Sequence, residues 1–339
     1  MKALPTAPAR GVTIRDVARL SGVSAMTVSR ALRQPETVSG DTLRKVQSAV
    51  KRTGYVSNRV ASRLSSNRGH VVGVVIPIIN AAFADTIRGM KDVLRQEGYE
   101  MLLGISDYSP QVEHAEVAEF LAQRVDAIAL TGHTHLPQTR AMLRRAGIPV
   151  VQIWTVTRRP IDLCVGLSHH AASRDMVRHL HARGYRRIAY LGGHTAHNDR
   201  TSERERGYVD AMHELQLPVS PASIVRRGFH LKEGASGLRE VRERMPDVEA
   251  VFCGSDMLAA GALFECQRQR LRVPQDLAIA GFDDAELSSE VCPALTTVHI
   301  PRFDIGVHAA QAMLARLSGL PQPARVQDLG YRIVVRETT

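Results

Sequence analysis

Hydrophobic and polar positions follow two different periods along this chain. Between residues 13 and 54, apolar residues recur every three or four positions, which predicts short amphipathic helices. From residue 71 onward, short apolar runs alternate with helical patterns, which predicts strands and helices in turn. The pattern therefore predicts a small all-α unit followed by a large α/β unit.

The first pattern predicts three short helices with recognisable caps. Thr13 and Asp16 form a capping box, and Ser24 caps a second helix after a glycine-containing turn. Ser39 caps a third helix, which ends at Gly54. The predicted core of this bundle is Ala18, Val23, Val28 and Leu32. A helix, a glycine-containing turn and a second helix make a helix-turn-helix, whose second helix lies in the major groove of DNA.

The second pattern predicts parallel sheets covered by helices on both faces. The predicted strands are 71–78, 100–106, 126–131, 150–154, 187–192, 249–254 and 277–282. The predicted helices include 83–96, 136–146, 172–183, 203–215 and 256–269. A Gly-Tyr joint between helix and strand occurs at 98–99 and again at 184–185, which favours two similar lobes over one wide sheet.

Charge is distributed very unevenly over the 339 residues. The chain has a net charge of +10, and residues 1–70 hold 13 Lys and Arg against 3 Asp and Glu. The remaining residues hold 31 of each sign. The excess positive charge therefore lies in the predicted helical unit, which indicates a polyanion as its partner. The exposed positions of the predicted second helix are short or suited to a groove, with Arg30 able to reach a base edge or a phosphate.

Other compositional features exclude several classes of protein. No apolar run is long enough to cross a bilayer, and the first residues lack the apolar core of a signal peptide. The four cysteines, with no CxxC pair among them, are predicted to be reduced and not to bind zinc. We also find no phosphate-binding loop or nucleophile elbow. We therefore expect a cytoplasmic, nucleoid-associated protein without catalytic residues, cofactor or metal.

Two stretches resemble a known family of regulators. Residues 12–30 resemble the headpiece of the lactose/galactose/purine (LacI/GalR) repressor family, and residues 54–64 resemble its hinge. The resemblance implies a hinge helix that starts at Asn58, faces its symmetry mate at Ala61 and wedges Leu64 into the minor groove. This chain departs from the family at Ser57, where proline is usual. The predicted DNA-contacting residues of the headpiece are Thr13, Ser24, Ala25, Met26, Thr27, Ser29, Arg30, Arg33, Ser39 and Thr42.

The resemblance covers essentially the whole chain and implies a sensor of two periplasmic-binding-protein-like lobes. The expected domains are 1–56 for the helix-turn-helix, 57–69 for the hinge and linker, 70–169 with 299–327 for the first lobe, and 170–298 with 328–339 for the second lobe. Ligands of such sheets sit beyond the carboxyl ends of the strands. The predicted effector-binding residues are Phe83, His133, His135, Trp154, His169, Arg204, Phe229, Ser255 and Asp283.

Arg204 and Asp283 are the strongest of these candidates. Arg204 begins an Arg-x-x-Gly-aromatic signature whose arginine reaches the effector in the family, and Asp283 matches its effector-binding aspartate. Asp256 is predicted to cap its helix. For Trp154, burial in the core and stacking on a sugar are equally good interpretations. A metal site at His133 and His135 is disfavoured because the spacing supplies no further ligands.

Further stretches resemble the gluconate-responsive branch of the family. They are Met26, 131–137, 165–167, 251–253 and 264–268. The resemblance implies a repressor of gluconate or ketogluconate metabolism, a homodimer or tetramer on near-palindromic double-stranded operator DNA, which the sugar acid releases. A departure at 167–170 leaves other effectors or a corepressor open. A solute-binding protein and a sugar-acid enzyme are the alternatives from other classes.

Overall fold

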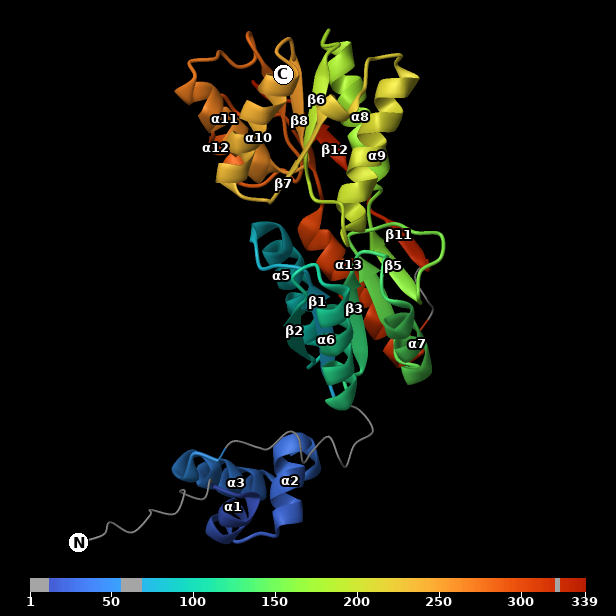
Figure 1. Cartoon of the computed structure of the whole chain (residues 1–339). Helices are drawn as coiled ribbons and strands as arrows, with labels where there is room; N and C mark the ends of the chain where they lie inside the picture. The colour runs from blue at the N-terminus through green and yellow to red at the C-terminus, as the bar shows by residue number, and fades with distance from the viewer. Residues whose placement is uncertain (1–11, 56–68, 321–323) are drawn as a thin grey trace, which may run out of the picture. The chain divides into compact units, whose positions relative to one another are not determined.

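The computed structural model describes residues 12–55, 69–320 and 324–339, except for the side chain of Arg33. The chain divides into two compact units, Met1–Arg68 and Gly69–Thr339 (Figure 1). The predicted hinge residues Asn58, Ala61 and Leu64 lie outside the described residues. Each unit is therefore considered by itself.

The first unit contains the predicted bundle of three helices. Its helices are α1 (Ile14–Ser21), α2 (Ala25–Arg33) and α3 (Gly40–Thr53), with a 3₁₀ turn η1 (Pro35–Thr37) between the last two. The carboxylate of Asp16 accepts hydrogen bonds from the backbone N–H and the hydroxyl of Thr13, at 3.0 and 2.7 Å. Gly54 ends α3 in the left-handed conformation, with φ +65°. The predicted capping box and helix end are confirmed.

The core of this bundle differs from the prediction at one position. Its buried residues are Val17, Val28, Ala31, Val46 and Ala49. Leu32 is 36% exposed, so its predicted place in the core is wrong. The buried face that carries Val28 continues through Ala31. Leu32 lies one position further round α2.

The first lobe of the second unit is built on a six-stranded sheet. Its parallel strands run in the order β11-β5-β4-β3-β1-β2. They are β1 (Val71–Ile76), β2 (Glu100–Ile105), β3 (Ala127–Thr131), β4 (Val150–Ile153), β5 (Leu163–Gly166) and β11 (Val326–Asp328). Along β1, Val72 and Val74 pack into one core and Val71 and Val75 into another, as period-two alternation requires.

Helices cover both faces of this sheet. The helices α5 (Ala81–Gln96) and α13 (Arg302–Ser318) pack together on one face. On the other face lie α6 (Pro110–Ala122) and α7 (Pro137–Ala146), whose side chains Phe120 and Leu143 meet Val71 and Val75 in one core. The sheet is therefore buried on both sides, which explains the nearly continuous apolar run of β1.

The second lobe repeats the arrangement on a four-stranded parallel sheet of order β7-β6-β8-β9. Its strands are β6 (Ile188–Gly193), β7 (Ile224–Arg227), β8 (Ala250–Cys253) and β9 (Ala278–Ala280). The paired helices are α8 (His169–Ala182) with α9 (Asp199–Glu214), and α10 (Leu231–Arg244) with α11 (Asp256–Arg268). Smaller elements are η2 (Pro221–Ser223), α12 (Leu287–Glu290), β10 (Thr297–His299) and β12 (Arg332–Val334).

Three connections join the two lobes. The chain passes from β5 to α8, from β10 to α13 and from β11 to β12. One buried core runs through both lobes, because residues of α5, α8 and α13 belong to the same cluster. The two-lobed α/β fold and the helical headpiece are as predicted. None of the described helices combines the length and the hydropathy needed to span a membrane.

Candidate functional site

The headpiece offers an exposed face at the start of α2. Met26 is 73% exposed, Arg30 is exposed, and Ala25, Thr27 and Ser29 are half-buried. The hydroxyl of Ser24 accepts a hydrogen bond from the backbone N–H of Thr27 at 3.1 Å, which caps the helix. Ala25, Met26, Thr27, Ser29 and Arg30 therefore lie at a capped helix start, whereas Val28 is buried in the core.

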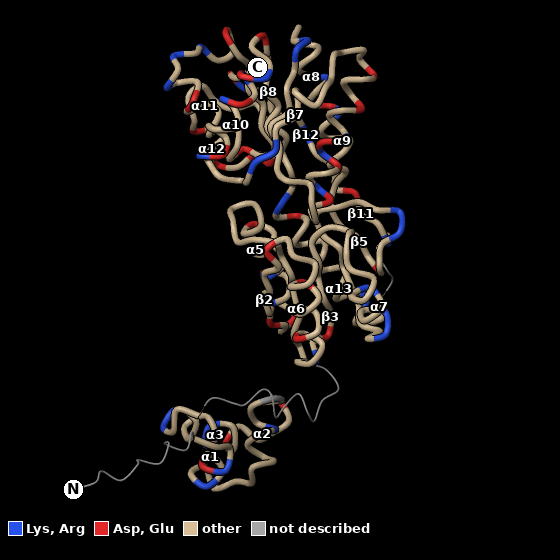
Figure 2. Tube along the Cα trace, in the orientation of Figure 1, with Lys and Arg blue, Asp and Glu red and all other residues tan. Residues whose placement is uncertain are grey.

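Three further predicted DNA contacts, Thr13, Ser39 and Thr42, lie at helix starts. Ser39 caps α3 through the backbone N–H of Thr42 at 3.3 Å, and its hydroxyl also contacts that of Thr42 at 2.9 Å. Thr13 is exposed at the start of α1. Lys and Arg positions occur along these helices (Figure 2). Asp41 pairs with Lys45 at 2.7 Å, whereas Lys51 and Arg52 stay exposed in the last turn of α3.

In the sensor unit, loops from the two lobes meet at the carboxyl ends of the strands. A cavity there is lined by Ser106, Tyr108, Thr131 and Thr134 of the first lobe and by His197, Asp199 and Arg200 of the second. The Tyr108 and Phe229 rings face each other across the lobes with centroids 6.5 Å apart. We call this region the interlobe cleft. It is the position where ligands of such sheets bind.

Backbone strain gathers around the interlobe cleft. Ten described non-glycine residues have positive φ, and four of them are Tyr108, Trp154, His197 and Asp283, with values of 57°, 62°, 57° and 119°. Each of these four follows a strand of one of the two sheets. Such conformations cost free energy and persist where the surrounding structure holds them, commonly at functional sites.

Arg204 lies on α9 with only 7% of its surface exposed. Its guanidinium donates to Nδ1 of His169 at 3.1 Å and to the hydroxyl of Thr201 at 3.2 Å, and it stacks on the Phe282 ring at 4.9 Å. The buried Nε has no hydrogen-bond partner. The buried hydroxyl of Tyr190 also lacks a hydrogen-bond partner among the described residues, and Arg204 is its electrostatic neighbour.

His169 holds Arg204 in place. Its Nε2 donates to the backbone carbonyl of Trp154 at 3.0 Å, which leaves Nδ1 as the acceptor for Arg204. Burial, followed by the charges of Arg204 and Arg200, lowers the pKa of His169 well below its usual value. The ring is therefore neutral at pH 7, with both nitrogens engaged by the protein. The structure places this predicted effector ligand behind Arg204.

Asp283 follows β9 and reaches the same cleft. Its backbone carbonyl accepts a hydrogen bond from Arg302, and within the described chain its carboxylate has no hydrogen-bond partner. Burial and the nearby charge of Asp256 raise the pKa of Asp283 to about 7, against the opposing charges of Arg204 and Arg302. Asp283 therefore offers a hydrogen-bonding carboxyl group beside the guanidinium of Arg204.

The neighbouring residues Ser255 and Asp256 are occupied within the second lobe. The hydroxyl of Ser255 accepts from the backbone N–H of Leu258 at 3.3 Å, so Ser255 rather than Asp256 caps α11. The carboxylate of Asp256 accepts from the hydroxyls of Thr297 and Ser288, at 2.6 and 2.7 Å. The predicted capping role of Asp256 is wrong, because its carboxylate is taken by distant parts of the chain.

Three aromatic side chains from the prediction fall into two groups. Phe83 and Trp154 are 5% and 3% exposed and pack against each other with ring centroids 4.9 Å apart. The Trp154 Nε1 donates to the hydroxyl of Thr86 at 3.0 Å. Of the two interpretations of Trp154, the structure therefore favours burial in the core. Phe229 is half-buried and faces the cleft opposite Tyr108.

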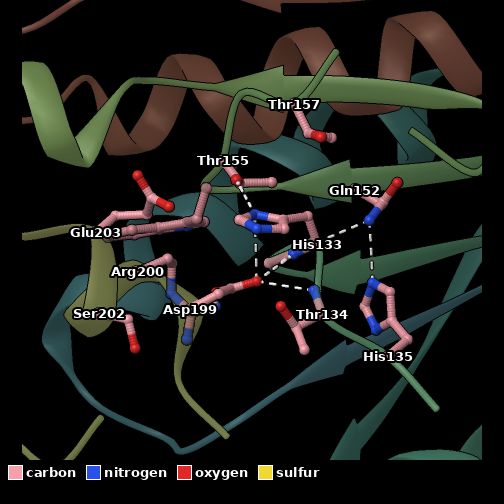
Figure 3. Close-up of polar contacts among 12 residues, drawn as sticks. His133, Thr134, His135, Gln152, Thr155, Thr157, Asp199, Arg200, Ser202 and Glu203 are labelled. Atoms are coloured by element: carbon pink, nitrogen blue, oxygen red, sulfur yellow. Dashed lines mark hydrogen bonds and ion pairs between the residues drawn. The ribbon is translucent and has the colours of Figure 1, made fainter. Parts of the chain in front are cut away.

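His133 and His135 point in different directions from one turn after β3 (Figure 3). His135 is 8% exposed, and its Nδ1 donates to the Glu113 carboxylate at 2.8 Å while Nε2 accepts from Gln152 at 3.1 Å. Its ring is therefore fully engaged inside the first lobe. The Nδ1 of His133 lies 2.9 Å from the Thr155 hydroxyl and 3.3 Å from the Asp199 carboxylate. His133 thus faces the second lobe.

Sequence reasoning missed two charged residues of the cleft, Asp199 and Arg200. They form the first turn of α9, which the sequence pattern placed four residues later. Asn198 caps this helix through the backbone N–H of Thr201 at 3.3 Å. An asparagine three residues before a threonine, followed by an acidic first turn, is the signal that could have located them.

Comparison with known proteins identifies the two units. Residues 13–58 match the model of bacterial regulatory proteins of the lacI family, and residues 177–339 match a periplasmic binding protein-like domain. The transcriptional regulator GntR of Escherichia coli K12 is 37% identical over 94% of this chain and 96% of its own length. This chain belongs to the lacI family of bacterial regulatory proteins. The regulator IdnR of Escherichia coli K12 is 34% identical over 95% of the chain and 97% of its own length.

Solved structures agree with this assignment to the lacI family. A LacI-family transcriptional regulator from Silicibacter pomeroyi has 33% identity and a TM-score of 0.88, over 96% of this chain and 99% of that one. A lac repressor dimer bound to operator and an anti-inducer has 26% identity and a TM-score of 0.85, over 97% and 99%. The chain is thus a DNA-binding transcriptional regulator of the lacI family, in the branch of the gluconate-operon repressors.

Proposed function

We propose that this lacI-family regulator is a homodimeric repressor that a sugar acid, gluconate or a ketogluconate, releases from its operator. The single observation that carries the effector assignment is the pair formed by Arg204 and Asp283. A buried guanidinium with an unpartnered Nε lies near a carboxyl group without a hydrogen-bond partner in the described chain. An arginine suits a carboxylate, and a carboxyl group suits hydroxyls, so the pair fits a hydroxy acid.

The walls of the cleft support the same class of ligand. Phe229 and Tyr108 supply two aromatic faces from opposite lobes, on which the carbon–hydrogen face of a polyol can pack. Arg200 adds a second cation, and its side chain is only 8% exposed. Arg200 and Arg204 thus supply two guanidinium groups, either of which can pair with the carboxylate of an acid. The similarity to GntR and IdnR points to the same branch of effectors.

Several observations support binding of a palindromic operator by a dimer. The first 70 residues carry the whole net charge, and α2 presents Met26 and Arg30 on an exposed face. The related lac repressor binds its operator as a dimer. A twofold dimer presents two recognition helices to two half-sites, so the operator is expected to be near-palindromic. The predicted roles of Asn58, Ala61 and Leu64 in the minor groove are part of this proposal.

In this proposal, binding of the effector and binding of the operator are coupled through the relative arrangement of the two lobes. A sugar acid that binds one relative arrangement of the lobes more tightly shifts the population toward it, and operator affinity changes by that differential binding. Three chain connections and one buried core join the two lobes. A change in the angle between the lobes therefore affects the whole sensor unit.

A thermal-shift screen of the full-length protein tests the effector assignment. Gluconate, 2-ketogluconate and idonate are compared with glucose and with inorganic phosphate. A ligand present at 100 times its Kd stabilises the folded state by about 2.7 kcal/mol, which is a shift of a few degrees. We expect the sugar acids to raise Tm and the neutral sugar not to. A shift with glucose alone, or turnover of the added acid, would contradict the proposal.

A further inference from the structure

The carboxylate of Asp199 joins the two lobes across the mouth of the interlobe cleft. Asp199 is the first residue of α9 in the second lobe, and its side chain is 7% exposed. Its Oδ2 accepts hydrogen bonds from the backbone N–H groups of His133 and Thr134 of the first lobe, at 2.5 and 2.9 Å (Figure 3). The Nδ1 of His133 lies 3.3 Å from the same oxygen.

The turn that receives this carboxylate is shaped for it. Gly132 has φ +86°, and a Cβ at this position would lie 2.6 Å from both the Asp199 Oδ1 and the Arg200 guanidinium. No other residue type could take this conformation without strain and also admit the carboxylate. Two successive backbone N–H groups that point at one anion form a strong, charge-assisted contact.

The carboxylate of Asp199 also binds Arg200, a residue that lines the cleft. The Oδ1 of Asp199 accepts from Arg200 at 3.1 Å, and both side chains are at least nine-tenths buried. Arg200 is also an electrostatic neighbour of Tyr108 on the opposite wall. Asp199 therefore fixes a cation of the cleft with one oxygen while it holds the other lobe with the second.

We propose that Asp199 is an interlobe latch, a positioning residue that favours the closed lobes and orients Arg200 toward the effector. The part of this inference that concerns the effector rests on the proposed function. The latch itself does not, since its contacts lie entirely within the protein. When only a fraction of the sensor molecules is closed, the apparent affinity for a ligand of the closed state equals the intrinsic affinity multiplied by that fraction.

The chain contains a matched control for the latch. Asp210 lies on the same helix and accepts a hydrogen bond from Nε2 of His170 at 2.7 Å, but both residues belong to the second lobe. Asp199→Asn and Asp210→Asn therefore remove the same charge from α9 and weaken a histidine contact, and only the first crosses the lobes. Gly132→Ala disrupts the latch from the first lobe without changing any charge.

Hydrogen exchange of the full-length, ligand-free protein tests the latch directly. We expect the amides of His133 and Thr134 to exchange at least tenfold faster in Asp199→Asn and in Gly132→Ala, and unchanged in Asp210→Asn. Unfolding by urea checks that all three variants remain folded. Equal exchange in Asp199→Asn and the unaltered protein would overturn the latch.

Calorimetric titration with gluconate tests the link to the cleft. We expect Asp199→Asn and Gly132→Ala to raise the Kd for gluconate at least tenfold, and Asp210→Asn to leave it unchanged. Faster exchange at residues 133 and 134 with an unchanged Kd would overturn the positioning role. If the unaltered protein binds no gluconate while the exchange difference is present, the proposed effector is wrong and the latch is supported.

Discussion

The carboxyl group of Asp283 gives the sharpest prediction of stability from this structure. It lies after β9 near Arg204, with no hydrogen-bond partner in the described chain, and its pKa is raised to about 7 from 3.8. Burial is the main cause, and the charge of Asp256 adds to it. Replacing Asp283 with asparagine keeps the shape of the side chain and removes its ionisation.

The size of the effect follows from the difference in pKa between the folded and unfolded states. A rise of about 3 pH units corresponds to about 4 kcal/mol as an upper limit. Because Asp283 is half-buried and opens to the cleft, screening by solvent reduces this to roughly 2 kcal/mol. A raised carboxyl pKa means that the folded state holds the proton more tightly. The stability that Asp283 contributes is therefore fully present below pH 3.8 and is lost as pH rises toward 7.

Urea unfolding of the unaltered protein and Asp283→Asn between pH 5 and pH 8 measures this effect. We expect the difference in unfolding free energy to change with pH and to favour the variant by about 1.3 kcal/mol at pH 8 relative to pH 5, because part of the total is already lost between pH 3.8 and pH 5. Ser255→Ala, in the adjacent helix cap, is the control, with a difference that is independent of pH. A pH-independent difference for Asp283→Asn would refute the reasoning about the cleft.

Three further predictions concern the two functional ends of the chain. Arg204→Ala should abolish the thermal shift caused by gluconate while operator binding is retained, and an unchanged shift would remove Arg204 from the site. Leu64→Ala should weaken operator binding more than binding to non-specific DNA in anisotropy titrations, since the family resemblance makes it the minor-groove wedge, and equal losses would contradict that role. Ser24→Ala removes the cap of α2 at a cost of about 1 kcal/mol and should speed hydrogen exchange of α2 about fivefold, against no change in α9.

Much of the fold could be predicted because its signals are local. The caps Thr13, Ser24 and Ser39 each lie within three residues of the groups that they bond. The alternation of short apolar runs and amphipathic helices also predicted both lobes. The strands β5 and β7 were missed, although β4 and β8 are equally short and were predicted; β7 ends in two arginines and so lacks the apolar run that marks β4 and β8. Leu32 was misplaced because a helix of nine residues leaves its buried face uncertain by one position.

Candidate residues of the site were predicted where they follow a strand, as Asp283, His135 and Ser255 do, or where a sequence signature marks them, as for Arg204. Arg204 and Asp283 lie near Tyr108 of the cleft, and their contact with an effector stays a prediction. His135 and Ser255 lie at the expected strand ends, but their polar atoms are already hydrogen-bonded within the protein. Ser255 bonds the nearby Leu258, whereas His135 bonds Glu113 and Gln152, which are distant in sequence. Asp199 was missed for the same reason, because its partners are 65 and 66 residues away. Tertiary contacts thus decide which polar groups remain free for a ligand.

The central claim is that a sugar acid in the interlobe cleft controls binding of DNA by the headpiece. The most direct test is a fluorescence anisotropy titration of the full-length protein on an operator selected from DNA upstream of its own gene, with and without gluconate. The account predicts that gluconate raises the Kd for the operator at least tenfold, that glucose has no effect, and that Arg204→Ala removes the response. An operator affinity that is the same at every gluconate concentration would contradict it.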